Sequence, residues 1–352
     1  MSVFFGNVFV TVLLALIPTA AVGTRADCSA TFRSNEAINS SVVYARGLLH
    51  ELGGDALVTS APDRVAVMIL FSQGFGSHLN DRLRLLRCSL RKLQLNMPNT
   101  PKDVYVWVPP ETVAQSPEWM TENARTFAMG IHPASWQFPC GLEHDSKWTA
   151  RRNFNLEYYK MGRWRLAFSM DFVKEMGYKY MLQYDDDAML NGMIDQNLVA
   201  EFKSKNFDMG VFSDSIGEVN HIALGLPELT KFWLTLRKFT PVGALLDHVA
   251  GHTVQAFSSD SWDRMYHPGY FVFIKVDFWF SEPVQDYLLF VYRSARDIES
   301  RWQEQLIQNM IRLVFIPKVR LWVMALIDIG HDRHRKGNFE AWCVKAGINT
   351  TV

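Results

Sequence analysis

Three consecutive acidic residues, Asp185, Asp186 and Asp187, directly follow an apolar stretch of the chain at 180–184. Adjacent carboxylates repel one another, so they are tolerated where solvent or a cation offsets the repulsion. A strand end that delivers Asp185 and Asp187 suits a hard cation such as Mg²⁺ or Mn²⁺, which carboxylates and substrate phosphates commonly hold together. The pattern indicates an enzyme that acts on a nucleoside diphosphate compound. A solvated acidic turn after a strand is the alternative interpretation.

The elements before the acids predict how the chain positions them. Seven apolar residues at 65–71 predict a strand that is buried on both faces, and 104–108 predicts a second strand. Leucines at helical spacing over 79–94 predict a helix between them, which completes a βαβ unit. The acids lie at the carboxyl end of a further strand at 178–184, where open α/β sheets bind their ligands. We therefore predict an α/β fold with a ligand site at this edge.

The remaining elements are predicted from periodicity and composition. Helices are expected at 163–176 and 291–313, and strands at 209–212, 270–276 and 314–327. Two other stretches, 111–160 and 241–264, are expected to be irregular, the second as a long loop or lid.

Composition and charge limit the classes of function. Hydrophobic residues make up 48% of the 352 residues, which is typical of a globular chain with one large domain or two smaller ones. The 36 Lys and Arg residues balance the 36 Asp and Glu residues, and we expect no nucleic-acid partner. An anionic ligand must therefore be bound by local chemistry.

The N-terminal segment has the features of a targeting sequence. Residues 3–22 carry no charged side chain, and small residues at 21–23 have the spacing of a signal cleavage site. We expect 1–23 to be a signal peptide or a signal-anchor, with a buried N-terminal helix as the alternative. A stem or peripheral segment is expected at 24–61, a catalytic domain at 62–342 and a C-terminal tail at 343–352.

Two further sequence features are compatible with the secretory route. N-glycosylation sequons begin at Asn39 and Asn349. Four cysteines allow two disulfides with three possible connectivities, or stay as free buried thiols: Cys28, Cys88, Cys140 and Cys343.

The segments around the acids, 158–164 and 179–187, resemble glycosyltransferase family 15, the fungal α-1,2-mannosyltransferases of the Golgi. In that family a Met-x-Arg-aromatic segment precedes a strand that ends in Glu-Pro-Asp. Asp185 matches the Glu and Asp187 the final Asp, while Asp186 replaces the proline and gives the Asp-x-Asp form of many nucleotide-sugar transferases. A looser resemblance continues at the segments 300–304, 315–318 and 328–334, so that it spans 64–339 in all.

The resemblance implies a GT-A fold, in which a single Rossmann-like domain contains a mixed central sheet, and a Mn²⁺ (or Mg²⁺) site for GDP-mannose. Asp187 is then expected to bind the metal directly. Asp185 is expected to bind it through water or to contact the nucleotide ribose, with Asp186 beside it in the donor site. His334 is expected to complete the metal site, and His331 is the alternative ligand.

Two arginines at the start of the helix before the acidic strand are candidates for phosphate binding. A guanidinium fork matches two phosphate oxygens, and the resemblance favours Arg163 for this role. The alternative for Arg163, and equally for Arg165, is a salt bridge.

Two glutamates are candidates for the group that retaining transfer needs on the β-face of the sugar, as nucleophile or as stabiliser of an oxocarbenium-like state. Glu299 and Glu304 are expected within one helical turn, so both cannot face the site equally. The alternative for either is an exposed helix acid. At Ser300 and Val272 the chain departs from the family, which has glutamates there.

The predicted function is therefore a metal-dependent glycosyltransferase of the secretory pathway, most similar to a retaining mannosyltransferase that uses GDP-mannose. Its partners are the nucleotide-sugar donor and a glycan or glycoprotein acceptor. The N-terminal segment anchors it in the Golgi membrane or is cleaved before secretion. Three alternatives remain open: the same fold with a UDP-sugar donor, a metal-free glycosidase with paired carboxylates, and a carbohydrate-binding relative without turnover. The sequence does not indicate an oligomeric state.

Overall fold

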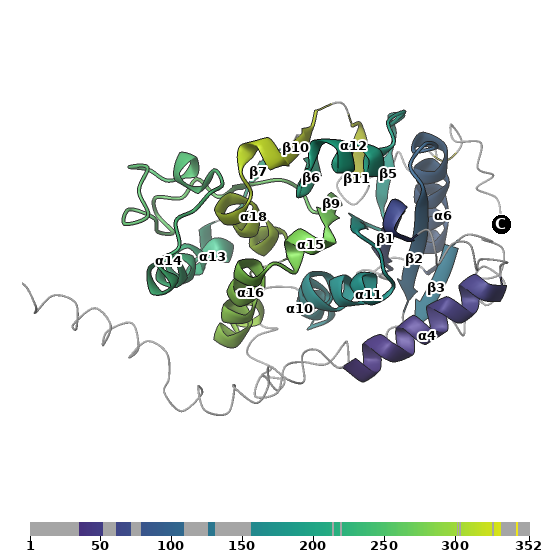
Figure 1. Cartoon of the computed structure of the whole chain (residues 1–352), viewed down its shortest axis with the longest axis horizontal. Coiled ribbons are helices and arrows are strands. Elements are labelled where there is room, and N and C mark those ends of the chain that lie inside the picture. The colour runs from purple at the N-terminus through teal and green to yellow at the C-terminus, as the bar shows by residue number, and fades with distance from the viewer. Residues whose placement is uncertain are drawn as a thin grey trace, which may run out of the picture.

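The computed structural model of the chain describes residues 35–51, 61–71, 79–108, 126–130, 156–212, 215–218, 220–300, 302, 304–325, 327–331 and 343. The N-terminal segment 1–23 and His334, for which predictions were made, lie outside these residues. Within them, helices pack on both faces of one central sheet (Figure 1).

The central sheet has seven strands in the order β10-β6-β9-β4-β1-β2-β3. Its strands are β1 (Val65–Leu70), β2 (Lys102–Val108), β3 (Thr126–Gly130), β4 (Tyr180–Tyr184), β6 (Met209–Phe212), β9 (Phe271–Lys275) and β10 (Leu321–Met324). Strand β9 runs antiparallel to both of its neighbours, β4 and β6, and all the other pairs are parallel. The predicted mixed sheet is therefore confirmed.

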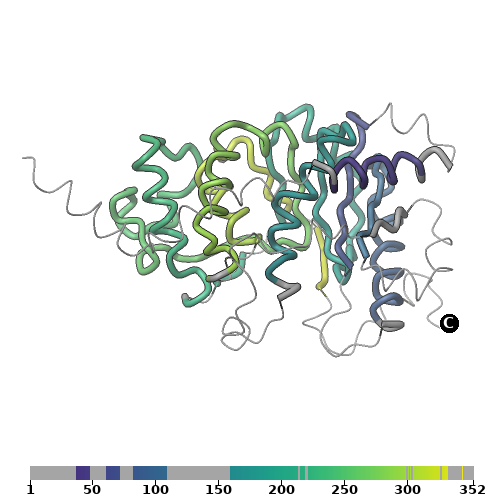
Figure 2. Tube along the Cα trace, turned by 90° about the horizontal axis from the view of Figure 1, so that it is seen from below, coloured from purple at the N-terminus to yellow at the C-terminus, as the bar shows by residue number. Residues whose placement is uncertain are grey.

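Strand β1 lies between two hydrophobic layers, as its unbroken apolar sequence predicts. All six of its residues are buried, and alternate side chains belong to different core clusters, Met68 to one and Val67 to the other. Helix α6 (Leu79–Asn96) covers the Val67 face with Leu83, Leu86, Leu90 and Leu93, and such a leucine contributes roughly 1.5–3 kcal/mol when fully buried. Helix α4 (Asn35–Glu51), within the segment expected to be a stem or a peripheral helix, packs on the other face (Figure 2).

A continuous helical segment precedes the acidic strand. It consists of α10 (Leu156–Arg163), a π-helical segment η4 (Trp164–Phe168) and α11 (Ser169–Glu175). The side chains of Trp164, Phe168 and Phe172 meet the ring of Trp107 edge to face, with centroids 5.5, 5.3 and 5.1 Å away. The predicted helix thus exists but begins at Leu156, and the prediction of irregular structure over 111–160 was wrong for α10 and β3.

The single helix predicted at 291–313 was also wrong, because three helices cover this part of the chain. They are α16 (Glu282–Ser294), α17 (Arg296–Glu299) and α18 (Glu304–Phe315). Ala295 lies between α16 and α17 in the left-handed region with φ 58°, which ends α16. The strand predicted at 314–327 shrinks to β10 after a 3₁₀ turn, η6 (Lys318–Arg320).

Shorter elements complete the described structure. The helices are α12 (Leu198–Lys205), α13 (Asn220–Ala223), α14 (Leu226–Arg237) and α15 (Val276–Trp279), with 3₁₀ turns η2 (Ala61–Asp63) and η5 (Leu245–His248). Two small antiparallel sheets pair β5 (Ala188–Leu190) with β11 (Ile329–His331), and β7 (Ile216–Gly217) with β8 (Met265–Tyr266). The stretch 241–264 contains η5 and one isolated bridge, and is otherwise the predicted long loop.

A disulfide joins Cys88 on α6 to Cys343, with Cα atoms 5.4 Å apart. These two cysteines are therefore not the free thiols of the alternative prediction. Cys28 and Cys140 lie outside the described residues. In the part of the chain that the structure describes, no helix has the length and apolar character needed to cross a membrane.

Candidate functional site

The acidic run forms the turn between β4 and β5. The turn is held from inside the fold, because the buried Tyr184 hydroxyl donates to Ala188 O at 2.9 Å and accepts from Leu190 N at 3.2 Å. Ser89 of α6 donates to the same Ala188 carbonyl at 2.6 Å. The carboxylates therefore project from a rigid strand end rather than from a free loop.

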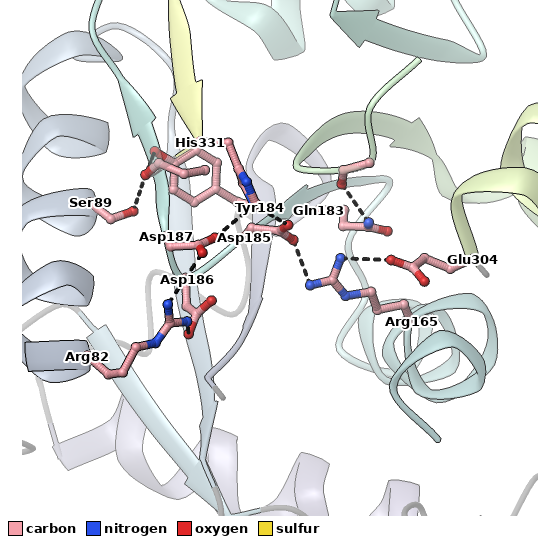
Figure 3. Close-up of polar contacts among 12 residues, drawn as sticks. Arg82, Ser89, Arg165, Gln183, Tyr184, Asp185, Asp186, Asp187, Glu304 and His331 are labelled. Carbon is pink, nitrogen blue, oxygen red and sulfur yellow. Dashed lines mark hydrogen bonds and ion pairs between the residues drawn. The ribbon is translucent and has the colours of Figure 1, made fainter. Parts of the chain in front are cut away.

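His331 is brought to the acids by strand pairing. Strand β11 lies antiparallel to β5, with His331 opposite Ala188, the residue that follows Asp187. As Figure 3 shows, His331 Nε2 lies 2.9 Å from Asp187 Oδ1 and 3.3 Å from Asp185 Oδ2. The imidazole also stacks on the Tyr270 ring, with centroids 5.1 Å apart. The pairing and the stacked ring fix the orientation of the imidazole.

The three side chains have the donor set of a divalent-cation site. One ligand atom from each of Asp185, Asp187 and His331 lies within 4.8 Å of the others. Carboxylate and imidazole ligands suit Mn²⁺ and other divalent cations. Asp185 and Asp187 thus lie where the sequence placed them, and the alternative ligand His331 joins them. The role expected for His334 stays a prediction.

The charges within this group stabilise one another. Burial opposes ionisation of Asp185, but Arg165 and His331 outweigh that effect and hold the pKa of Asp185 below its usual range. The pKa of Asp187 is lowered in the same way, against burial, by His331 and by Arg82. For His331, burial would lower the pKa, but the two carboxylates raise it to about 10. Without a metal, His331 is therefore a cation at neutral pH.

Arg165 connects the acids to helix α18. Its guanidinium lies 2.6 Å from Asp185 Oδ1 and 3.1 Å from Glu304 Oε1, and both partners are well buried (Figure 3). Burial raises the pKa of Glu304, although Arg165 opposes this effect. The second oxygen of Glu304 is buried, and no residue in the described part of the chain forms a hydrogen bond with it. Glu304 is thus a buried carboxyl group behind Arg165, not an exposed helix acid.

Arg163 lies on a different side of the same helical segment. It forms a buried ion pair with Asp297 of α17, donates to Tyr292 O at 3.3 Å and lies 5.1 Å from the Tyr292 ring centroid. Two residues along a helix turn the side chain through about 200°, so Arg163 and Arg165 cannot both reach the acids. The structure therefore shows a salt bridge at each arginine, and phosphate binding by Arg163 stays a prediction.

The two candidate glutamates lie in different helices. Glu299 is the last residue of α17 and Glu304 the first of α18, so the expectation that one helical turn holds both was wrong. The chain leaves helical geometry after Ser300, because α17 ends there. The roles predicted for both glutamates stay predictions. Val272, where the resembling family has a glutamate, is a buried residue of β9.

Arg82 is a site residue that the sequence analysis missed. Its guanidinium, on α6, lies 2.5 Å from Asp186 Oδ2 and 3.3 Å from Asp187 Oδ2 (Figure 3). It therefore supplies a counter-charge to the acids from the side opposite Arg165. Its sequence signal is weak, because several other arginines occupy the same helix.

Comparison with solved structures finds this fold in fungal mannosyltransferases. Core-mannan synthase A (CmsA/Ktr4) from Aspergillus fumigatus, in its Mn/GDP form, aligns with a TM-score of 0.62 and 15% identity over 77% of this chain and 75% of that chain. The mannosyltransferase Ktr4p from S. cerevisiae, in complex with GDP, aligns with a TM-score of 0.62 and 13% identity over 89% of this chain and 86% of that chain. No protein-family model and no curated protein sequence matches the chain.

The predicted fold class is confirmed by these alignments. The chain has the GT-A fold, with its mixed central sheet and its acidic turn at the carboxyl end of β4. At this level of identity the alignments establish the shared fold and not a shared chemistry.

Proposed function

We propose that this protein is a metal-dependent glycosyltransferase that transfers mannose from GDP-mannose, with retention, to a glycan or glycoprotein acceptor. The convergence of Asp185, Asp187 and His331 at the carboxyl end of β4 carries the proposal. It is supported by a fold shared with mannosyltransferases whose structures contain GDP, and by the sequence resemblance to glycosyltransferase family 15.

The residues of the acidic turn fit the metal that this function needs. Asp187 and His331 would hold Mn²⁺ or Mg²⁺, with Asp185 as a further ligand or as a contact to the nucleotide ribose. A bound cation supplies neutralisation of the charge that develops on the diphosphate leaving group. His331 must give up its proton before it can serve as a ligand.

The arginines would then place positive charge around the donor. Arg165 holds Asp185 and is itself fixed by Glu304, so Glu304 acts on the site by positioning Arg165. Arg82 occupies the other side of the acids, and it would bind the diphosphate only if it left Asp186 and Asp187. Arg163 would bind the diphosphate only if it left Asp297. Glu299 remains the candidate group for the β-face of the sugar.

We further propose that the protein acts in the secretory pathway, in the Golgi lumen or after secretion. The uncharged segment 3–22 and the two sequons support this location. The Cys88–Cys343 disulfide supports it as well, because disulfides persist mainly in oxidising compartments.

A donor panel tests the proposed function. Hydrolysis and transfer would be measured for GDP- and UDP-sugars with Mn²⁺, in the wild type, after EDTA treatment and in Asp187→Asn. Asp195→Asn is the matched control, because it makes the same chemical change at an exposed site. We expect turnover of GDP-mannose that EDTA and Asp187→Asn abolish and Asp195→Asn preserves.

Other outcomes of the panel have defined meanings. Metal-dependent turnover of a UDP-sugar alone would replace the donor and keep the transferase. Metal-dependent nucleotide binding without turnover would favour the carbohydrate-binding relative. No nucleotide binding with any metal would overturn the proposal, as would turnover that resists EDTA.

A further inference from the structure

Arg312 on α18 is a buried cation that pairs with no anion among the described residues. Its side chain is 6% exposed, and its Nε and Nη2 both donate to Asn309 Oδ1, at 3.0 and 2.7 Å. Among the residues that the structure describes, no carboxylate forms an ion pair with it. Burial lowers the pKa of Arg312 to about 10. It is still charged at neutral pH, so its charge needs compensation that the described residues do not supply directly.

Asp263 is the described carboxylate whose charge acts on Arg312. Asp263 attracts it at longer range, but its two oxygens are engaged elsewhere: Oδ1 accepts from Met265 N at 3.0 Å, and Oδ2 contacts His248 Nδ1 at 2.8 Å. Asn309 is fixed in turn, because its Nδ2 donates to Met265 O at 3.0 Å. The guanidinium is therefore held in place by neutral groups.

The other deeply buried arginines of the described structure behave differently. Arg163 pairs with Asp297, and Arg165 pairs with Asp185 and Glu304. Such pairing is the rule, because an uncompensated buried charge is strongly unfavourable. At Arg312, the planar guanidinium is held against Asn309 and keeps N–H donors that Asn309 does not use. A planar group with several donors suits a carboxylate or a phosphate.

Arg312 is also placed along the helix that reaches the candidate metal site. Helix α18 begins at Glu304, the partner of Arg165, and lies between the central sheet and the lobe that contains α13 and α14 (Figure 1). Arg312 follows eight positions later, about 12 Å along the helix axis. Its bonds to Asn309 turn the side chain back toward the N-terminal end of α18.

We propose that Arg312 and Asn309 form an oxyanion subsite that binds a carboxylate or phosphate group carried by the acceptor. The acceptor assignment rests on the proposed transferase function, whereas the binding of an oxyanion does not. The protein would then select an acidic saccharide, with the charged group bound away from the reacting hydroxyl.

Thermal unfolding of the full chain, with and without inorganic phosphate or glucuronate, tests the subsite. We expect both anions to raise the melting temperature of the wild type. In Arg312→Met and Asn309→Asp this response is lost, since the first removes the cation and the second supplies an internal counter-charge. Anion binding elsewhere would persist in both variants and in the control Arg237→Gln, which removes a surface arginine.

The anion-free melting temperatures separate this proposal from a structural role. Arg312→Met should melt higher than the wild type, because it removes an uncompensated buried charge. Lower melting of Arg312→Met, or anion responses equal to that of the wild type in both variants, would overturn the subsite.

Transfer assays then test the acceptor assignment. We expect the ratio of kcat/KM for acidic over neutral acceptors to fall at least tenfold in Arg312→Met and to stay at the wild-type value in Arg237→Gln. Phosphorylated and uronic-acid acceptors, compared separately, identify the anion. An equal fall for acidic and neutral acceptors would overturn the assignment. An absence of turnover in the wild type would instead contradict the transferase proposal, and the anion-binding result would stand.

Discussion

His331 Nε2 lies 2.9 Å from Asp187 Oδ1. The contact joins distant parts of the chain, because 146 positions separate His331 from Asp185, which lies two residues before Asp187. The contact arises from the pairing of β11 with β5, which sets His331 opposite Ala188. The register of this strand pair therefore brings the three candidate metal ligands together. A shift of β11 by one residue would turn Gly330 toward the acids in place of the imidazole.

Metal affinity should rise with pH. The pKa of His331 is raised to about 10, whereas the pKa values of Asp185 and Asp187 are lowered, so metal binding near neutrality must displace one proton from His331. We expect the apparent Kd for Mn²⁺ to fall about tenfold per pH unit between pH 6.5 and 8.5. Isothermal titration calorimetry measures this, and a flat profile in the wild type would contradict the assignment.

When metal is absent, His331 should make the free energy of unfolding fall as the pH rises. A group whose pKa is raised on folding stabilises the fold fully below its unfolded pKa of about 6.5, and this contribution is lost as pH rises toward 10. Metal-free protein should therefore lose part of its free energy of unfolding between pH 7 and 10, as measured by urea denaturation. His331→Gln should show a smaller loss over that range.

Loss of Arg165 should lower the free energy of unfolding by more than the loss of its two ion pairs alone. Arg165→Met leaves the buried Asp185 and Glu304 carboxylates without their shared cation, which we expect to cost about 3–5 kcal/mol. Adding Glu304→Leu should recover part of this loss, because it removes a buried carboxyl group that has lost its partner cation Arg165. Denaturant titration of both single variants and the double variant measures the coupling. Strict additivity would contradict the arrangement.

The disulfide should contribute to stability through the chain length that it closes. Cys88 and Cys343 are 255 positions apart, and we expect Cys343→Ser to lower the free energy of unfolding by about 2–5 kcal/mol. Reduction of the wild type should cause a similar loss, while the variant should respond much less to the reductant. Equal responses of both proteins would assign the effect to another cysteine pair.

Two glycines offer a matched test of core packing away from the site. A Cβ at Gly210 would lie 2.8 Å from the ring of Phe202, so Gly210→Ala should cost about 1–3 kcal/mol. Gly47 in α4 has open space at that position, and Gly47→Ala should stabilise the protein by about 0.4–1 kcal/mol. Thermal melts of both variants measure the difference. A stabilising Gly210→Ala would contradict the packing described for β6.

Long apolar runs made the central part of the fold predictable. Strands β1, β2, β4 and β9 are nearly continuous hydrophobic sequences, and α6 has a clear leucine face. The positions of Asp185 and Asp187 followed from where β4 ends. The break between α16 and α17 was not predictable, since Ala295 adopts the left-handed geometry that a sequence rule expects of glycine.

The partners of the acids were harder to predict than the acids themselves. Arg82 and Glu304 come from helices distant in sequence, and His331 depends on the pairing of two strands with three residues each. Strands of that length carry no detectable alternation. The sequence resemblance pointed to two histidines, and only strand register decided that His331 meets the acids.

The pairing of β5 with β11 also bears on how the protein folds. Because it joins Leu190 to Ile329, it closes a long loop and carries a large entropy cost, and such long-range contacts tend to form late. A folding intermediate that lacks this pairing would have the two carboxylates but not the imidazole. We therefore expect Mn²⁺ to slow unfolding while leaving the refolding rate nearly unchanged, which stopped-flow fluorescence would measure. The cation would then bind after the fold has formed and stabilise it, and it would not nucleate folding.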